Sequence, residues 1–445
     1  MQRIASLAAI AVAAVTAGAT LAQGTAPAAP GARPPGPATE NTRLPPQASP
    51  RPEQRPETLA SAEKAVAERD ASAADFRRWV EDFRPRALAQ GIDARIFDRA
   101  FEGVSYDPAV IRRDRSQNEF TKTVWVYLDS AVSDARVAAG REAHEENRAL
   151  LDEIEARYDV DKRVLLAIWG LESAYGTFRG SERVIRSLAT LAYDTRRADF
   201  FEGQLLDALH ILQNGHTTPA QMRGSWAGAM GHTQFMPSSF RELAVDWDGD
   251  GKRDIWSDDP ADALASAANY LQENGWQHGL PWGVEVTLPE DFDYTLAARE
   301  ITKMPSDWAG LGVTATDGSP VPDHGPASVL LPGGHRGAAF LIFDNFEVIE
   351  SYNTADAYVI GVGHLGDRIM GGPPVQHDWP REDRALTLEE RLELQRRLRE
   401  AGFDPEKIDG RIGPLTINAV RDYQQSEGMV PDGYPSLQVL EALRS

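Results

Sequence analysis

Residues 164–176 read VLLAIWGLESAYG, and this stretch decides how the centre of the chain folds. Four apolar residues recur at helical spacing along one stripe: Val164, Leu165, Ile168 and Leu171. This periodicity predicts an α-helix, and a glycine after the last apolar turn is typical of a helix end. We therefore predict a buried helix that stops at Gly176 and carries one carboxylate, Glu172, near its end.

The neighbours of Glu172 on this helix are apolar or aromatic. Ile168, Trp169 and Tyr175 lie three or four residues away from it in sequence, which places them on the same helix face. Burial disfavours an ionised carboxylate and raises the pKa of a Glu side chain above its usual ~4.3. A carboxylic acid that keeps its proton near neutral pH can protonate a glycosidic oxygen. The structural alternative is a glutamate bonded to a helix end or to a buried arginine.

The composition of the 445-residue chain narrows the possible functions. Lys and Arg number 46 against 67 Asp and Glu, for a formal net charge of -21, so we expect neither nucleic acid nor an anionic membrane surface as a partner. Cysteine is absent from the sequence, which rules out disulfides, thiolate metal sites and cysteine nucleophiles. The length and the 42% of hydrophobic residues predict roughly two or three folded domains.

The N-terminal region predicts export. Residues 1–22 combine a basic start, an apolar run and small residues before a cleavage position, which is the layout of a secretory signal peptide. A single membrane anchor is the alternative. Residues 23–59 hold ten of the 29 prolines and predict an extended linker. We expect a soluble, exported protein without a stable membrane anchor.

Residues 60–372 alternate helical patterns with aromatic and glycine-rich turns. Apolar residues recur at helical spacing in two sets: Phe76, Trp79, Val80 and Phe83, and then Leu205, Leu206, Leu209 and Leu212. Strand-like runs are fewer and lie at residues 283–288, 338–343 and 358–362. The pattern predicts a mainly α (α+β) body with a small sheet, followed by a proline-containing linker at residues 373–385.

Residues 386–445 predict a separate unit of three helices. Thr387 precedes Glu390 by three residues, which is the spacing of a capping box, and Gly402 supplies a left-handed stop to this first helix. The second helix is expected to begin around Thr416 and the third at Leu437.

A second segment, residues 224–237, gathers glycines, Trp226 and Phe235 around a single glutamine, Gln234. Small residues let the backbone approach a ligand closely, and aromatic rings offer flat faces to sugars. The alternative is a compact helix–loop junction with a packing role only. Ser225 is excluded as the nucleophile of a hydrolase elbow, because Arg223 stands where that motif requires glycine.

A third segment has the carboxylate spacing of an EF-hand loop. Carboxylates occupy loop positions 1, 3, 5 and 9, and glycine occupies position 6: Asp246, Asp248, Asp250, Asp254 and Gly251. Position 12 is Ser257 instead of Glu, so a later acid, Asp258, Asp259 or Asp262, would have to replace the usual bidentate ligand. We predict flanking helices and a weak structural site for Ca²⁺ or Na⁺; a loop rich in Asx turns is the alternative.

Two adjacent arginines, Arg196 and Arg197, can hold an anionic group of a substrate, such as a lactyl or peptide carboxylate. Considered alone, such a pair is more often a surface salt bridge. The zinc-protease pattern that begins at His144 fails at Arg148, and the sequence contains no nucleotide-binding glycine loop.

Taken in order, these segments resemble the lytic murein transglycosylase B family. The family's signatures match at residues 172–176, 191–197, 225–237, 246–256, 267–271 and 351–353, followed by Tyr358. The resemblance covers about residues 70–372. Residues 386–443 separately resemble a peptidoglycan-binding domain, whose core motif is matched by Asp409, Gly410, Gly413 and Thr416.

The resemblance implies a lysozyme-like helical core with a small β portion. It also implies cleavage of the β-1,4 bond between N-acetylmuramic acid and N-acetylglucosamine in peptidoglycan. Glu172 would be the single acid/base, which protonates the leaving oxygen and then takes the proton of the muramyl C6 hydroxyl, so that a 1,6-anhydro ring closes without water. The substrate's N-acetyl group would stabilise C1, and a second carboxylate would not be needed.

The resemblance also assigns roles by position. Ser225 would orient Glu172, and the glycan cleft would be lined by Gln234, Tyr270, Asn353 and Tyr358, with the arginine pair beside it. The ion ligands would be Asp246, Asp248, Asp250, the Lys252 carbonyl and Asp262. Two extra residues after Trp256 weaken the assignment of Asp262, and His232-Thr233 stands where some members have Tyr-Gly.

The expected partner is therefore the glycan strand of peptidoglycan, met in the periplasm, with other cell-wall enzymes as further candidates. The chain is expected to act as a monomer and to need no cofactor for its chemistry. Two alternatives stay open: a muramidase that hydrolyses the same bond, and a non-catalytic scaffold that binds peptidoglycan.

Overall fold

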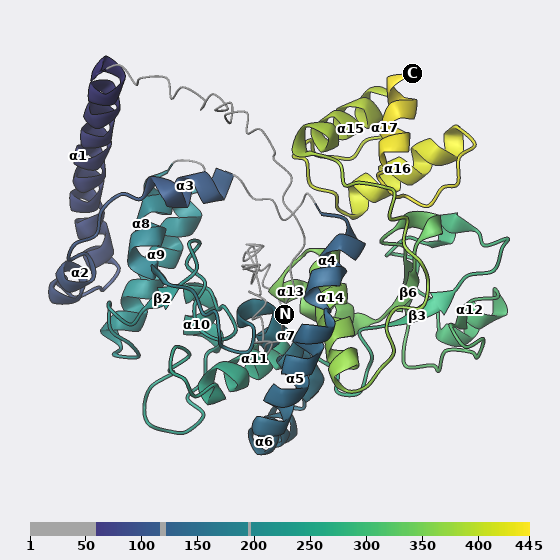
Figure 1. Ribbon diagram of the computed structural model, residues 1–445, viewed down its shortest axis with the longest axis horizontal. Helices are drawn as coiled ribbons and strands as arrows, with labels where there is room; N and C mark the ends of the chain where they lie inside the picture. Colours follow the sequence, from purple (N-terminus) through teal and green to yellow (C-terminus); the bar gives the residue numbers. More distant parts are fainter. Residues whose placement is uncertain (1–58, 116–121, 195–196) are drawn as a thin grey trace, which may run out of the picture. The chain divides into compact units, whose positions relative to one another are not determined.

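The computed structural model describes residues 59–115, 122–194 and 197–445, with side chains from residue 73 onward. The predicted signal peptide and nearly all of the N-terminal linker lie outside the described residues. This part of the chain is mainly helical, so the predicted α-rich class is confirmed (Figure 1). Its first nine helices are α1 (Leu59–Ala89), α2 (Ala94–Ala100), α3 (Pro108–Arg115), α4 (Val124–Ala131), α5 (Asp134–Glu146), α6 (Arg148–Tyr158), α7 (Lys162–Ser173), α8 (Val184–Tyr193) and α9 (Ala198–Gln213).

The later helices complete the body and form the C-terminal unit. They are α10 (Pro237–Leu243), α11 (Ala261–Glu273), α12 (Pro305–Gly310), α13 (Asp344–Tyr352), α14 (Asp356–Ile369), α15 (Leu388–Glu400), α16 (Pro414–Ser426) and α17 (Leu437–Arg444). The two apolar sets of the sequence lie in α1 and α9, and helices flank the acidic loop as α10 and α11, all as predicted. Among the described residues, no helix is both long and apolar enough to cross a bilayer.

Two small antiparallel sheets accompany the helices. Strands β1 (Glu182–Arg183) and β2 (Arg223–Gly224) form one pair. The other sheet has the order β4-β3-β6-β5, with strands β4 (Thr314–Ala315), β3 (Gly283–Thr287), β6 (Ala339–Ile342) and β5 (Ser328–Leu330). The predicted strands at 283–288 and 338–343 are therefore confirmed as β3 and β6.

The predicted strand at residues 358–362 is wrong, because these residues belong to helix α14. A short apolar run does not distinguish a strand from a buried helix. Here the run continues at helical spacing to Leu365 and Ile369, and α14 packs against α7 and α4, so that apolar residues are buried on several of its faces. Because the run is buried on both sides, its sequence is continuously apolar, as it is in a central strand.

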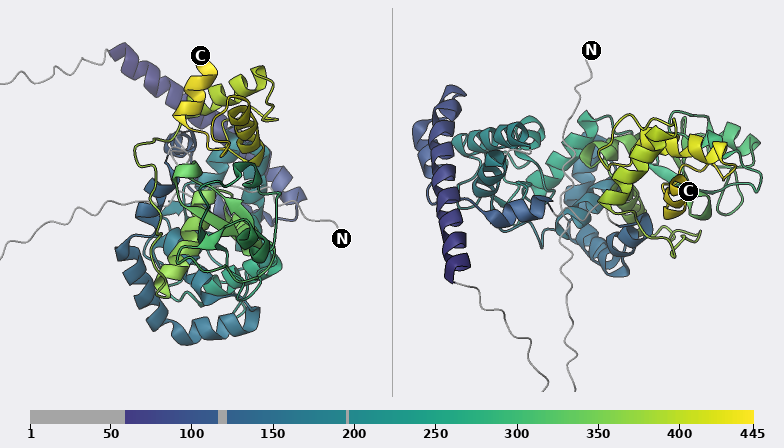
Figure 2. Two further views of the ribbon diagram at one scale, coloured as in Figure 1. Left: turned by 90° about the vertical axis from the view of Figure 1, so that its right-hand side faces the viewer. Right: turned by 90° about the horizontal axis from the view of Figure 1, so that it is seen from above.

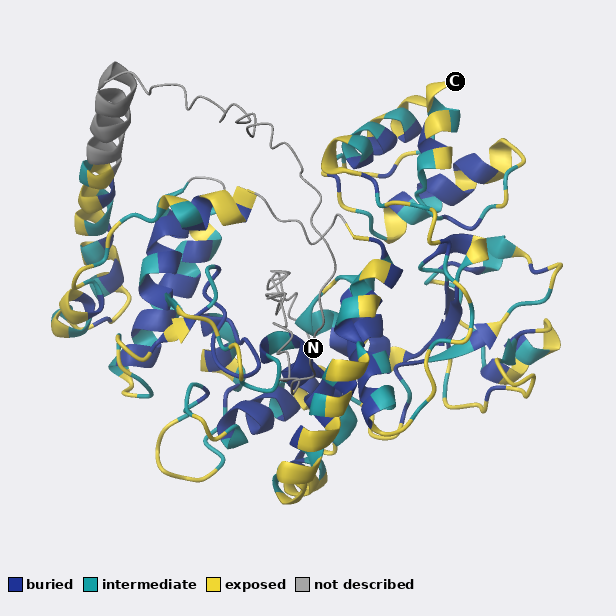
Figure 3. Cartoon of the chain, in the orientation of Figure 1, coloured by how far each residue is buried: buried dark blue, intermediate teal, exposed yellow. Residues whose placement is uncertain are grey.

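Helix α7, which carries Glu172, forms the centre of the larger core. In α7, Leu165, Leu166 and Ile168 are completely buried, and the same cluster includes residues of α11 and α14. A second cluster surrounds α8 and α9 and takes in Phe76 and Phe83 of α1. Figure 3 shows these buried residues running through α8, α9 and α14. Residues 224–236 pack against the second cluster, while α7 belongs to the first.

The three C-terminal helices share a core of their own, built from Leu394, Leu398, Val420 and Leu440. Figure 2 shows α15, α16 and α17 grouped together in both views. The predicted capping box is present, since the Thr387 hydroxyl accepts from the N–H of Glu390 and the Glu390 carboxylate accepts from the N–H of Thr387. Gly402 adopts the predicted left-handed conformation with a φ of 92°.

Candidate active site

Glu172 lies in the last turn of α7 and is half-buried. The helix ends in a left-handed turn, because Ala174, Tyr175 and Gly176 all have positive φ angles. This turn folds the ring of Tyr175 back along α7: a Cβ atom on Gly170 would lie 2.5 Å from the Tyr175 hydroxyl. The glycine and the tyrosine of this stretch therefore act together to shape the helix end that presents Glu172.

Helix α14 supplies a hydrogen-bond partner of Glu172. The phenol of Tyr358 donates to Oε1 of Glu172 over 2.6 Å, and Tyr358 is itself buried. Burial and the neighbouring charge of Glu172 raise the pKa of Tyr358 well above its usual range. The phenol is therefore protonated at every physiological pH and acts as a fixed donor to this one carboxylate oxygen.

Three aromatic rings form a wall close to Glu172. Tyr270 and Tyr352 meet edge to face with ring centroids 4.9 Å apart, and Phe235 lies about 6 Å from each of them, at 5.9 and 6.1 Å. The Tyr352 hydroxyl donates to the Thr233 carbonyl and the Tyr270 hydroxyl to the Ser351 carbonyl, both over 2.6 Å. Burial, and then the charge of Glu172, raise the pKa of Tyr352 well above its usual range. The wall is thus rigid and lies within the electrostatic reach of the carboxylate.

The glycine-rich segment makes a tight turn next to this wall. The Ser225 N–H donates to the Ala229 carbonyl, and Met230 pairs with Phe235 through two backbone hydrogen bonds of 2.9 Å. Gln234 stands at the tip of the turn with a φ of 52°, and its side-chain nitrogen donates to the Gly231 and Arg179 carbonyls. The turn therefore holds the Gln234 amide in one orientation.

The predicted cleft residues differ in how they relate to Glu172. Tyr358 contacts it directly, and Tyr270 belongs to the aromatic wall. The Ser225 hydroxyl oxygen accepts from the N–H groups of Ala227 and Ala229, so these bonds close its own turn, and its role in orienting Glu172 stays a prediction. The Asn353 side chain accepts from the Ala355 N–H at the start of α14.

The structure describes only the second arginine of the predicted pair. Arg196 lies outside the described residues, whereas Arg197 pairs with the buried carboxylate of Asp114 and stacks over Phe201, with 5.0 Å between its guanidinium carbon and the ring centroid. These contacts give Arg197 a structural ion pair, which was the alternative interpretation of the sequence.

The acidic loop brings three of its predicted ligands together. Carboxylate oxygens of Asp246, Asp248 and Asp250 all lie within 4.8 Å of one another, and oxygen-only ligands of this kind suit a hard cation. Asp262 does not belong to this group. Its two oxygens accept from the N–H groups of Trp247 and Asp254, at 2.8 and 2.7 Å, so it holds the two ends of the loop.

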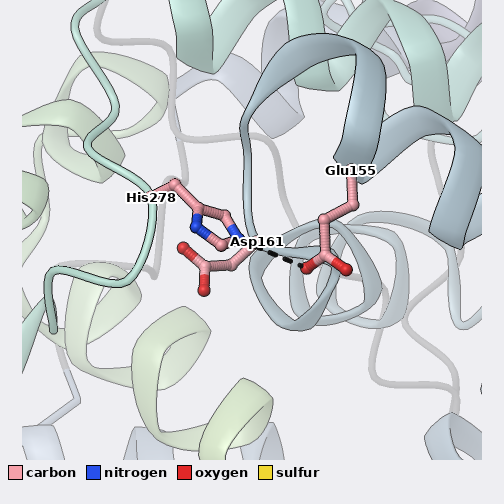
Figure 4. A group of neighbouring side chains, drawn as sticks. All are labelled: Glu155, Asp161 and His278. Atoms are coloured by element: carbon pink, nitrogen blue, oxygen red, sulfur yellow. Dashed lines mark ion pairs between the residues drawn. The ribbon is translucent and has the colours of Figure 1, made fainter.

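A second group of possible metal ligands has a different character. Glu155, Asp161 and His278, which are drawn in Figure 4, also place ligand atoms within 4.8 Å of one another. However, Glu155 pairs with the Lys162 ammonium at 2.9 Å, and Asp161 accepts from the Trp276 indole and the Gly279 N–H. A lysine and neutral donors already satisfy these carboxylates, so the group joins the α6–α7 junction to the segment after α11.

Sequence reasoning missed two parts of the site. Tyr352 lay inside a quoted signature but was not singled out, because an aromatic residue at helical spacing usually belongs to a core. His232 was noted only as a departure from the family, yet its ring is buried against Trp169, beside the end of α7. The hydrogen bonds of both residues join segments far apart in the chain, and no local pattern reveals such contacts.

Comparison with known proteins places this site in a family. The transglycosylase SLT domain matches residues 75–367, and a peptidoglycan-binding domain matches residues 387–443. Membrane-bound lytic murein transglycosylase B of Escherichia coli is 34% identical over 219 residues, which is 48% of this chain and 58% of that relative. The matched region thus spans a little over half of the relative's length.

Two solved structures extend the comparison. SltB3 from Pseudomonas aeruginosa, in complex with NAG-anhNAM-pentapeptide, has 51% identity and a TM-score of 0.80, covering 83% of this chain and 99% of that one. The E. coli lytic transglycosylase Slt35, in complex with calcium, has 28% identity and a TM-score of 0.57, covering 66% of this chain and 92% of that one. The chain therefore belongs to the transglycosylase SLT family of lytic murein transglycosylases.

Proposed function

We propose that this chain is a lytic transglycosylase that cleaves the β-1,4 bond between N-acetylmuramic acid and N-acetylglucosamine and leaves a 1,6-anhydro-muramyl end. The hydrogen bond from Tyr358 to Glu172 is the observation that carries the proposal. A general acid has to be held in position and has to carry its proton on a defined oxygen; this contact positions the side chain and occupies one of its two oxygens.

The direction of this bond assigns the acid proton. Because Tyr358 donates to Oε1 of Glu172, the transferable proton belongs on Oε2. In the first step Oε2 gives this proton to the glycosidic oxygen while the bond from that oxygen to C1 breaks. In the second step the carboxylate takes the proton of the C6 hydroxyl while the oxygen of that hydroxyl forms a bond to C1. Glu172 is thereby restored to its acid form, and no water is consumed.

One carboxylate is sufficient if the substrate stabilises its own C1 between the two steps. The N-acetyl group of the muramyl residue would supply that stabilisation, as the family resemblance implies. Tyr270 and Tyr352, which are partly exposed, support glycan binding, because flat apolar faces suit sugar rings and exclude water. The buried ring of Phe235 packs against both of them. We propose that Ser225, Gln234 and Asn353 complete this cleft; Gln234 is the best supported of the three, because its amide is held in one orientation.

Three further roles belong to the same proposal. Asp246, Asp248 and Asp250, with the Lys252 carbonyl, would hold a structural Ca²⁺ or Na⁺; calcium is present in the related Slt35 structure, and Asp262 would support the loop more than the ion. The C-terminal helices would bind peptidoglycan. The protein would work as a monomer in the periplasm, after cleavage of residues 1–22, and other cell-wall enzymes are candidate partners.

Replacement of the acid tests the proposal. In Glu172→Gln the side chain still accepts from Tyr358 but has no proton of the required acidity, so release of anhydro-muropeptides from isolated sacculi should fall by ~10²-fold or more. Mass spectrometry of the released fragments is the measurement, and an unchanged unfolding midpoint is the control for an intact fold. Retained release in the variant would refute the role of Glu172.

The same product analysis separates the alternatives. Fragments heavier by one water molecule would identify a muramidase that hydrolyses the bond. Binding to sacculi without any release by the wild type would identify a scaffold. The proposed transglycosylase yields anhydro ends with the wild type and none with Glu172→Gln.

A further inference from the structure

His232 lies against the helix that carries Glu172, and its two ring nitrogens have three polar neighbours: Trp169, Ser257 and Arg179. The ring is almost completely buried, with 2% of the residue exposed. The Trp169 indole Nε1 lies 3.0 Å from Nδ1 of His232, and the Ser257 carbonyl oxygen lies 2.8 Å from Nε2. Arg179 Nη1 lies 3.1 Å from the same Nε2 and also donates to the Ser257 carbonyl. An indole nitrogen only donates, so Nδ1 is the acceptor, and the single ring proton sits on Nε2, whose nearer partner is the Ser257 carbonyl. The ring is therefore neutral and bridges Trp169 to Ser257.

The backbone of the same segment holds the surroundings of Glu172. The His232 carbonyl accepts from the hydroxyl of Ser173, the residue after Glu172, over 2.6 Å. The next carbonyl, that of Thr233, accepts from Tyr352 over 2.6 Å. Two consecutive carbonyls thus bind the end of α7 and the end of α13, and the His232 ring belongs to the same segment as these carbonyls.

The chain makes room for the ring. A Cβ atom on Gly176 would lie 2.6 Å from the Cε1 and Nδ1 atoms of His232, so the glycine that ends α7 also admits the imidazole. Burial lowers the pKa of His232, and the charge of Arg179 adds to this; the hydrogen bond to the Ser257 carbonyl opposes the change most, followed by the charges of Asp258 and Asp259. Arg179 binds the Ser257 carbonyl and pairs with Asp258, which fixes the acceptor of the His232 proton.

We propose that His232 is a positioning residue for Glu172, which locks the catalytic end of α7 to the Ser257 carbonyl at the end of the acidic loop. The inference rests on the proposed function, because it concerns the same acid. It predicts that loss of the ring's two hydrogen bonds lowers the turnover number and leaves substrate binding nearly unchanged, since the cleft walls stay in place while the acid shifts.

Two substitutions break the bridge from Trp169 to Ser257, one at His232 in its middle and one at Trp169 at its end. His232→Phe keeps a flat ring and removes both bonds, and Trp169→Phe removes only the indole N–H. We expect each to lower kcat for anhydro-muropeptide release by about 10- to 100-fold, with KM within about 2-fold of wild type. Because the bond between Trp169 and His232 is already absent in His232→Phe, the double variant should be little worse than that single variant.

Conservative variants supply a rescue test. In His232→Asn the side-chain oxygen can take the place of Nδ1, and in His232→Gln the side-chain nitrogen can take the place of Nε2. Each keeps one of the two bonds, so kcat should lie between the values of wild type and His232→Phe. A purely structural histidine would instead produce the same kcat per folded molecule in all three variants, with only the unfolding midpoint changed.

The closing experiment measures kcat and KM on sacculi for wild type, His232→Phe, Trp169→Phe and the double variant, with folded fractions checked by circular dichroism. ¹⁵N NMR of histidine-labelled protein should show a protonated Nε2 and an unprotonated Nδ1 for His232. A folded His232→Phe with wild-type kcat, an effect confined to KM, or the opposite tautomer would each overturn the inference while the transglycosylase activity stands. An inactive wild type would instead overturn the proposed function.

Discussion

Helices α13 and α14 contribute to two carboxylate sites, and the structure holds the acids of these sites with different donors. At one site the Arg299 guanidinium bridges Glu350 and Asp356, donating to both oxygens of Glu350 over 3.0 Å. At the other site Tyr358, two residues after Asp356, donates a neutral phenol to Glu172. Burial alone would lower the pKa of Arg299, but the charges of Asp356 and Glu350 outweigh it and raise that pKa. At the acids themselves burial raises the pKa of Glu350 and of Asp356, and the charge of Arg299 opposes this rise, whereas the donor at the second site is neutral.

Helix α14 therefore contributes both to an ion-pair network and to the candidate active site. A guanidinium favours the charged form of a carboxylate and fixes a network that contributes to folding. A phenol can orient a carboxylate without supplying a positive charge. The structural site thus has a charged donor, and the candidate catalytic site includes a neutral one.

The largest effect is expected when the charged site is broken. Arg299→Met leaves Glu350 and Asp356 partly buried without their counter-charge, so the free energy of unfolding should fall by about 2–4 kcal/mol. Urea denaturation measures the loss. Arg299→Lys keeps the positive charge but not the planar guanidinium that binds both acids, so its free energy of unfolding should fall by less. Equal stability of Arg299→Met and wild type would show that the network does not hold the fold.

A third titratable group on α14 sharpens the comparison, because it is buried as a neutral base. Burial, and then the charge of Arg368, lower the pKa of His364 to about 4. The unfolded chain therefore binds a proton at His364 more readily than the folded chain does. The contribution of neutral His364 to the free energy of unfolding is complete above the unfolded pKa of about 6.5, and it is lost as the pH falls from there towards 4.

His364→Leu should weaken this pH dependence. The variant has no base to protonate, so its loss of unfolding free energy between pH 7 and pH 4.5 should be about 2 kcal/mol smaller than that of wild type. Urea titrations at the two pH values provide the measurement. An identical acid dependence of the two proteins would show that His364 is readily protonated in the folded state.

The smallest effect is expected at the phenol itself. Tyr358→Phe removes one hydrogen bond to Glu172, which should cost about 1 kcal/mol of stability and lower kcat about 10-fold. Tyr175→Phe is the matched control, because its phenol binds the Arg136 carbonyl at 3.2 Å instead of the acid. The control should lose similar stability with little change in kcat. Equal losses of kcat in both variants would show that the hydrogen bond from Tyr358 to Glu172 has no particular role in catalysis.

Much of this account follows from sequence because it rests on local patterns. The α7 stripe, the capping box at Thr387 and the aspartate spacing of residues 246–254 are each contained within a few turns of chain, and each has its counterpart in the structure. The mistaken strand at 358–362 had the same apolar composition as a true strand, and only its packing against α7 and α4 makes it a helix.

The contacts of the site itself are not predictable in this way. The bonds from Tyr358 to Glu172 and from Trp169 to His232 span 186 and 63 residues, so no spacing rule reaches them. Asp262 was assigned to an ion from its place in the family pattern, and only the coordinates reveal two backbone N–H groups on its oxygens. Satisfaction of buried polar groups is a property of the folded whole.

Protonation of Glu172 at neutral pH is the central claim, and infrared difference spectroscopy tests it most directly. Spectra of wild type minus Glu172→Gln at pH 7 isolate this one side chain. The account predicts the carbonyl band of a protonated carboxylic acid, which disappears as the pH is raised and activity is lost. A difference spectrum at pH 7 that contains only carboxylate bands would contradict it.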